Sequence, residues 1–108
     1  MTRRVVITGG GSGIGLTIAK RYLDEGAQVA ICDNDPDLVK TVSEYYKVAI
    51  SFCADVSHSN QMVAFHQHIM DEFGGGDIMY ANAGVGGPAG SVDIIDHQEW
   101  KRCVEVNL

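Results

Sequence analysis

Glycines cluster between Thr8 and Gly15, where the chain reads Thr-Gly-Gly-Gly-Ser-Gly-Ile-Gly. Gly9 would allow a tight turn, Gly13 would let the backbone approach a pyrophosphate, and Gly15 would let a helix pack closely on a strand. A helix that begins in such a loop offers unpaired N–H groups and the positive end of its dipole to phosphates. No Gly-Lys-Ser/Thr follows, which excludes a P-loop NTPase. The segment therefore indicates a dinucleotide site, with a ligand-free glycine turn as the alternative.

An acidic residue, Asp33, stands 18 residues after Gly15 and ends the next apolar run. About 20 residues is the spacing at which a carboxylate binds the adenosine ribose of a dinucleotide. A carboxylate there would repel a 2′-phosphate, and the glycine loop holds Ser12 at its centre rather than Lys or Arg. NAD is therefore favoured over NADP. The alternative is that Asp33 only opens the turn into Asp35 and Pro36.

Two weaker signals follow later apolar runs. From the position of Asp55 and Val56 a side chain can reach an adenine edge, although Asp55 could equally belong to a turn or a helix cap. Ala81, Asn82, Ala83 and Gly84 follow the fourth run, and small residues at the carboxyl end of a strand leave room for a cofactor.

These residues need strands and helices to position them. Short apolar runs predict strands over residues 5–8, 28–32, 48–54 and 78–81. Three amphipathic helices would lie between them, and their apolar faces would be formed by Ile14, Ile18, Tyr22 and Leu23, by Leu38, Val42, Tyr45 and Tyr46, and by Met62, Phe65, Ile69 and Phe73.

Helix ends are also marked. Asp35 with Pro36 predicts the start of the second helix, and Ser57 or Ser59 would cap the third. Gly26 and the glycines from position 74 predict the ends of the first and third helices. A last helix would begin at a capping box of Asp96 and Glu99 and continue through Trp100, Val104 and Leu108.

Strands that alternate with helices imply a parallel sheet with right-handed crossovers, and therefore a doubly wound α/β fold. The continuous apolar runs agree with a sheet covered on both faces. The apolar pattern of the last helix is still running at Leu108. We therefore expect residues 1–108 to form a single incomplete domain that stops within its last helix.

Composition narrows the function classes. The chain has 108 residues and a formal net charge of −6, with 45% apolar and 20% charged residues, which excludes disordered and collagen-like classes. No apolar run approaches the roughly 20 residues of a membrane helix, and the acidic balance argues against nucleic acid. Three widely spaced cysteines predict reduced thiols in a cytoplasmic protein, and the four histidines show no pattern of a metal site.

Taken together, these segments resemble the amino-terminal part of a classical short-chain dehydrogenase/reductase, and the resemblance runs from Arg4 to Leu108. Its most specific elements are the glycine motif, Asp55-Val56, Asn82-Ala83-Gly84 and the helix segment from Trp100 to Asn107-Leu108. The chain departs from the family's Asn-Asn-Ala-Gly motif, because Ala81 replaces the first asparagine.

The resemblance implies a Rossmann-type fold with strand order 3-2-1-4-5-6-7, of which this chain would supply 3-2-1-4 and leave its fourth strand as an open edge. It implies that the adenosine ribose is held by Asp33 and that the adenine is flanked by Asp55 and Val56. The pyrophosphate and its flanking riboses would be held by Gly9, Ser12, Gly13, Ile14 and Gly15. The nicotinamide-side ribose would be supported by Asn82, Ala83 and Gly84.

The same resemblance bears on catalysis. Asn107 matches the family's helix asparagine, which helps organise a water and proton relay to a catalytic lysine. The family's Tyr-x-x-x-Lys does not occur in the printed sequence. The implied reaction is hydride transfer between NAD and an alcohol or carbonyl of a small substrate, in a homo-oligomer, with this chain as the cofactor-binding half and without turnover alone. A non-catalytic NAD-binding module and a structural fragment are the alternatives.

Overall fold

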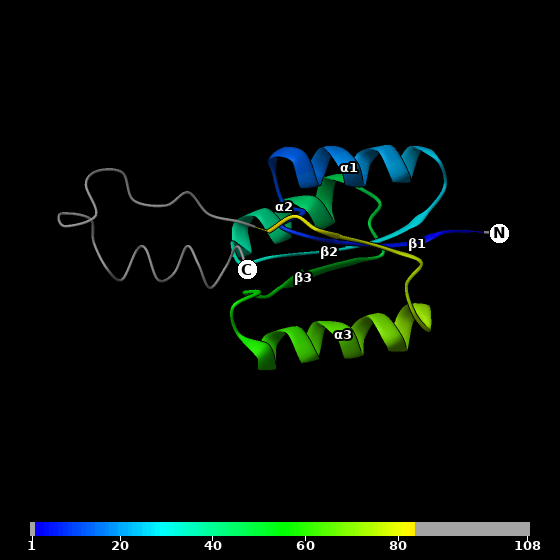
Figure 1. Cartoon of the computed structure of the whole chain (residues 1–108). Helices are drawn as coiled ribbons and strands as arrows, with labels where there is room; N and C mark the ends of the chain where they lie inside the picture. The colour runs from blue at the N-terminus through cyan, green and yellow to red at the C-terminus, as the bar shows by residue number, and fades with distance from the viewer. Residues whose placement is uncertain (1, 84–108) are drawn as a thin grey trace, which may run out of the picture.

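The computed structural model describes residues 2–83, so Gly84, the predicted last helix and Asn107 lie outside the described residues. The elements follow each other as β1 (Arg4–Thr8), α1 (Gly13–Asp24), β2 (Gln28–Asp33), α2 (Pro36–Tyr45), β3 (Ile50–Cys53), α3 (Ser59–Phe73) and β4 (Ile78–Ala81). The strands form one parallel sheet in the order β3-β2-β1-β4, in which Figure 1 labels β1, β2 and β3. The doubly wound α/β class and the 3-2-1-4 order are confirmed.

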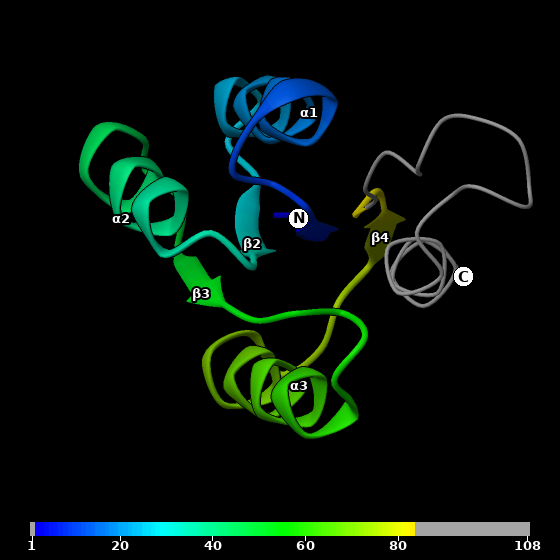
Figure 2. The same ribbon diagram turned by 90° about the vertical axis from the view of Figure 1, so that its left-hand side faces the viewer.

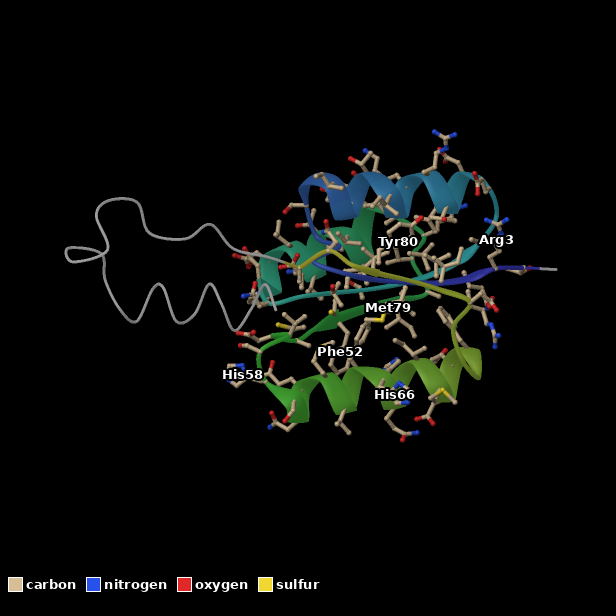
Figure 3. The ribbon with its side chains drawn as sticks, in the orientation of Figure 1. Arg3, Phe52, His58, His66, Met79 and Tyr80 are labelled. Carbon is tan, nitrogen blue, oxygen red and sulfur yellow. The ribbon has the colours of Figure 1, made fainter. Side chains whose placement is uncertain are left out.

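Helices cover both faces of the sheet. Figure 2 shows α1 and α2 on one face and α3 on the other. Because successive strand residues point to opposite faces, Val5 and Ile7 pack under α1 and α2, whereas Val6 packs under α3 with Phe65 and Ile69. Figure 3 shows the same alternation in later strands, with Tyr80 on the α1 side and Met79 and Phe52 on the α3 side.

The helix starts differ in how they are capped. Asp35 caps α2 as predicted, because its carboxylate accepts hydrogen bonds from the backbone N–H groups of Asp37 and Leu38. The prediction for α3 was wrong: the capping position is His58, without a side-chain cap, and Ser59 is the first helical residue. Ser57 does not cap the helix because its hydroxyl donates to the Asp55 carboxylate instead, at 2.6 Å.

Three other details differ from the sequence expectations. Ile14 is 73% exposed and Tyr45 is 77% exposed, so neither belongs to an apolar helix face. In the first turn of α1 the buried position is taken by Gly15, and at the end of α2 Tyr46, half-buried, packs against the core in place of Tyr45. The third strand is shorter than residues 48–54, because its pairing with β2 runs only from Ile50 to Cys53.

β4 is the edge of the sheet among the described residues. It pairs with β1 alone, and Met79 is 61% exposed. The predicted open apolar edge is thus present in the described part of the chain.

Candidate cofactor-binding site

A cleft of about 330 Å³ lies at the carboxyl ends of the strands. β1 continues into α1 on one face of the sheet, whereas the chain reaches the neighbouring β4 from α3 on the other face. In open α/β sheets ligands bind outside the carboxyl ends of the strands, at the point where the strand order reverses, and here that point lies between β1 and β4. The described residues that line the cleft are Gly9, Ser12, Asp33, Asn34, Asp35, Leu38, Ala54, Asp55, Val56, Asn82 and Ala83.

The glycine loop has the geometry that its sequence predicts. Gly9 has a φ of 65° and Gly13 a φ of 54°, a region in which residues with a Cβ are strained. A Cβ on Gly15 would collide with the Gly9 carbonyl and come within 2.6 Å of Asn82 Nδ2. A Cβ on Gly13 would meet no protein atom within 4 Å. Gly15 is therefore required by packing, whereas Gly13 borders open space at the helix end.

Among residues 2–83, no side chain caps the amino end of α1. Ser12 occupies the capping position, and its side chain makes no capping hydrogen bond. The helical ladder begins with the Leu16 N–H, which donates to the Ser12 carbonyl. The N–H groups before Leu16 have no intrahelical acceptor, and they are accompanied by the positive end of the helix dipole. These residues fit a pyrophosphate, which supplies both acceptor oxygens and negative charge.

Asp33 ties the loop to β2 and also faces the cleft. Its Oδ2 accepts a hydrogen bond from the Gly11 N–H at 3.1 Å, and its Oδ1 accepts one from the Asp35 N–H at 3.1 Å. Asp33 therefore takes part in the turn that follows β2. A carboxylate has about four lone-pair positions, so these two hydrogen bonds leave acceptor capacity for ribose hydroxyls.

The electrostatics of the cleft are acidic. Asp33, Asp35 and Asp55 all line it, and its described lining contains neither lysine nor arginine. A 2′-phosphate entering here would meet negative charge without a compensating cation.

Thr8 joins the parts of the candidate site, although its sequence position did not single it out. Its side chain is almost completely buried, and its hydroxyl accepts from the backbone N–H groups of Asn82 and Ala83, both at 3.1 Å. The Asn82 side chain in turn donates from Nδ2 to the Gly9 carbonyl at 3.2 Å. These bonds join β1, the glycine loop and the segment after β4. A lone hydroxyl at the end of an apolar strand was the signal that could have identified Thr8.

The turn after β3 contributes Asp55 and Val56 to the cleft. Asp55 Oδ1 accepts from the Ser57 N–H at 2.9 Å and from the Ser57 hydroxyl, and Asp55 Oδ2 lies 3.5 Å from His58 Nδ1. The turn interpretation of Asp55 therefore holds together with its place in the cleft wall.

The structure brings most of the predicted site together. Gly9, Ser12, Asp33, Asp55, Val56, Asn82 and Ala83 line one cleft, with Gly13, Ile14 and Gly15 in the adjoining helix start. Lining residues that the sequence reasoning missed are Asn34, Asp35, Leu38 and Ala54.

The described part of the chain, residues 2–83, has further features that bear on metal sites, membrane-spanning helices and cysteine thiols. No group of three or more His, Cys, Asp or Glu residues there is arranged to hold a metal ion, and no helix there has the length and apolarity to span a membrane. Cys32 and Cys53 are free thiols, and burial raises the pKa of the Cys32 thiol to about 11.

Known proteins share this arrangement. Residues 3–108 match the family model for the short chain dehydrogenase. The chain is 36% identical to (+)-borneol dehydrogenase 1 of Salvia officinalis, over 95% of this chain and 40% of that protein. It is also similar to a 3-ketoacyl-(acyl-carrier-protein) reductase from Brucella melitensis complexed with NADH, with a TM-score of 0.90, 34% identity, and coverage of 98% of this chain and 44% of that one.

A second solved structure, L-sorbose reductase from Gluconobacter frateurii complexed with NADPH and L-sorbose, gives a TM-score of 0.81 at 27% identity, over 98% of this chain and 42% of that one. The chain spans about two fifths of the length of the curated relatives it matches. The family model covers nearly all of its residues, and the sheet order, glycine loop and cleft agree with it, so the chain belongs to the short-chain dehydrogenase family.

Proposed function

We propose that this chain is the NAD-binding half of an oxidoreductase that transfers hydride between the nicotinamide and an alcohol or carbonyl carbon of a small substrate. The cofactor, when bound, supplies the hydride acceptor or donor. The chain's own residues bind and orient it in the cleft at the carboxyl ends of the strands.

The observation that carries the proposal is the Asp33 carboxylate beside the open amino end of α1. One site thus offers N–H groups for a pyrophosphate and, next to them, acceptor oxygens for ribose hydroxyls. The acidic lining supports NAD rather than NADP, since a 2′-phosphate would need a cation. Relatives crystallised with NADH and with NADPH support a nicotinamide cofactor of either kind.

The remaining roles complete the proposal. Gly9, Ser12, Gly13, Ile14 and Gly15 hold the pyrophosphate, Asp55 and Val56 flank the adenine, and Asn82, Ala83 and Gly84 support the nicotinamide-side ribose. Asn107 organises a proton relay, and the other catalytic groups are supplied outside residues 1–108, which form one incomplete Rossmann domain. The free thiols of Cys32 and Cys53 support a cytoplasmic location, and we propose a homo-oligomer.

A titration calorimeter tests this directly. NAD and NADP are titrated separately into the protein at equal ionic strength. We expect saturable binding of NAD at one site per chain and weaker binding of NADP. Tighter binding of NADP would contradict the assignment of Asp33, and absence of binding by both would overturn the proposed function.

A further inference from the structure

The turn between β3 and α3 is held from outside the cleft. Its residues Ala54, Asp55 and Val56 line the cleft, and the Ala54 N–H donates to the Asp33 carbonyl at 3.0 Å. The turn is thereby fixed to the end of β2, next to the carboxylate proposed to bind the ribose. Two residues outside the described lining, Ser57 and Gln61, reach into this turn.

Ser57 and Gln61 hold different atoms of Asp55. The Ser57 hydroxyl and the Ser57 N–H both donate to Asp55 Oδ1, at 2.6 Å and 2.9 Å. Gln61 Oε1 accepts from the Asp55 N–H at 2.8 Å. The carboxylate and the backbone of Asp55 are thus fixed by separate bonds, and a side chain held in this way loses little further freedom when a ligand arrives.

The Gln61 contact also connects the cleft to a rigid element. Gln61 lies in the first turn of α3, and this helix is anchored in the core by the buried side chains of Phe65 and Ile69. His58, at the amino end of α3 (Figure 3), lies 3.5 Å from Asp55 Oδ2, but its side chain is more than half exposed and the pair contributes little. The hydrogen bonds that Ser57 and Gln61 make with Asp55 are, in contrast, partly buried.

We propose that Ser57 and Gln61 are positioning residues that aim the Asp55 carboxylate at the exocyclic amino group of adenine and make the site selective for adenine over hypoxanthine. This inference rests on the proposed function. The amino group of adenine donates to a carboxylate, whereas hypoxanthine presents a carbonyl oxygen at the same ring position, which a carboxylate repels. Accurate aim therefore determines how well the two bases are distinguished.

The test compares NAD with nicotinamide hypoxanthine dinucleotide, which differs from NAD in that group of the base. The dissociation constants of both are measured by calorimetry on the parent, on Ser57→Ala and on Gln61→Met, and folding is checked by circular dichroism. We expect each variant to lose about three- to tenfold of the preference for NAD, as one hydrogen bond to a charged or buried group would suggest. Ser57→Thr, which keeps the hydroxyl, restores the preference.

Two matched control variants remove the same kinds of side-chain group, a hydroxyl and an amide, at nearby positions in α3. Ser59→Ala deletes a hydroxyl two residues on, and Gln67→Met deletes an amide on the exposed side of α3. Both keep the parent's preference if the inference is right. Equal weakening of the two dinucleotides by Ser57→Ala and Gln61→Met would show a structural role only and overturn it. A parent that binds NAD without distinguishing the two bases overturns the inference alone, whereas a parent that binds neither overturns the proposed function as well.

Discussion

The two ends of the parallel sheet use polar residues in opposite ways. At the amino end, Arg4 and Asp77 satisfy each other's hydrogen-bonding groups. The backbone N–H, Nε and Nη2 of Arg4 donate to the Asp77 carboxylate, and Nη1 donates to the Phe73 carbonyl. At the carboxyl end, Asp33 and the start of α1 keep hydrogen-bonding capacity directed into a cleft. Charged groups that pair with each other stabilise the fold, whereas groups that keep free hydrogen-bond donors or acceptors at a concave site are available to a ligand.

Substitutions at two glycines should give the largest difference in NAD affinity between the two ends of the sheet. Gly13 and Gly26 both have positive φ, 54° and 83°, and a Cβ on either meets no protein atom within 4 Å. We expect Gly13→Val to abolish NAD binding, by more than about a hundredfold, because its methyl groups fill the space of the pyrophosphate. Gly26→Val carries the same kind of strain at the amino end, and its NAD affinity should stay within about threefold of the parent. Calorimetry gives both affinities, and circular dichroism should show nearly unchanged helical content in both.

Thiol reactivity tests whether the sheet beneath the cleft is sealed. Cys32 is fully buried in β2, and its pKa is raised to about 11, mainly by burial, whereas Cys53 at the end of β3 is exposed. At pH 8 the thiolate fraction of Cys32 should be roughly a hundredfold below that of an ordinary thiol. Alkylation followed by peptide mass mapping should therefore label Cys53 long before Cys32. Equal rates would mean that the carboxyl end opens far more than the structure shows.

Two aspartates separate binding from stability. Asp33→Ala should weaken NAD binding roughly ten- to a hundredfold and reduce discrimination against NADP, because ribose acceptors are lost and the Gly11 N–H loses its partner. Asp77→Ala, at the amino end, should leave both affinities unchanged. Titrations of NAD and NADP into the two variants measure this. Unchanged NAD affinity in Asp33→Ala would rule out the ribose role.

The smallest effect concerns acid stability at the amino end. Hydrogen bonds from Arg4 lower the pKa of the Asp77 carboxyl. A lowered folded-state pKa stabilises the fold above the unfolded-state value of about 3.9, and this contribution disappears as the pH falls through the folded-state value. Asp77→Asn should therefore be slightly less stable than the parent at pH 7, with the difference shrinking below about pH 4. Urea unfolding at both pH values measures it, and a difference that grows in acid would have the wrong sign.

Much of this organisation was predictable from local sequence. The alternation of apolar strands and amphipathic helices predicted a parallel sheet, and the family resemblance supplied its 3-2-1-4 order. Asp35-Pro36 marked the start of α2 because a carboxylate cap and a fixed φ act within a few residues. The glycine loop was predictable for the same reason, since positive φ at Gly9 and Gly13 leaves a compositional mark.

Other parts depend on which partner each side chain meets in the folded chain. Thr8 gained its role only when β4 placed the N–H groups of Asn82 and Ala83 against its hydroxyl. Ser57 looked like a cap, but the competing Asp55 carboxylate took its hydroxyl. Tyr45 fitted the helical period, yet the final turn of α2 directs it to solvent. Periodicity and capping preferences contain no term for competition between such partners.

The contrast between the two ends can be measured in one experiment. ¹⁵N-labelled protein is titrated with NAD, and the amide shifts are followed by two-dimensional NMR. The account predicts saturable shifts at Gly9 to Gly15, Asp33, Asp55 and Asn82, with little change at Arg4, Gly26 and Asp77. Shifts that concentrate at the amino end, or no shifts at saturating NAD, would contradict it.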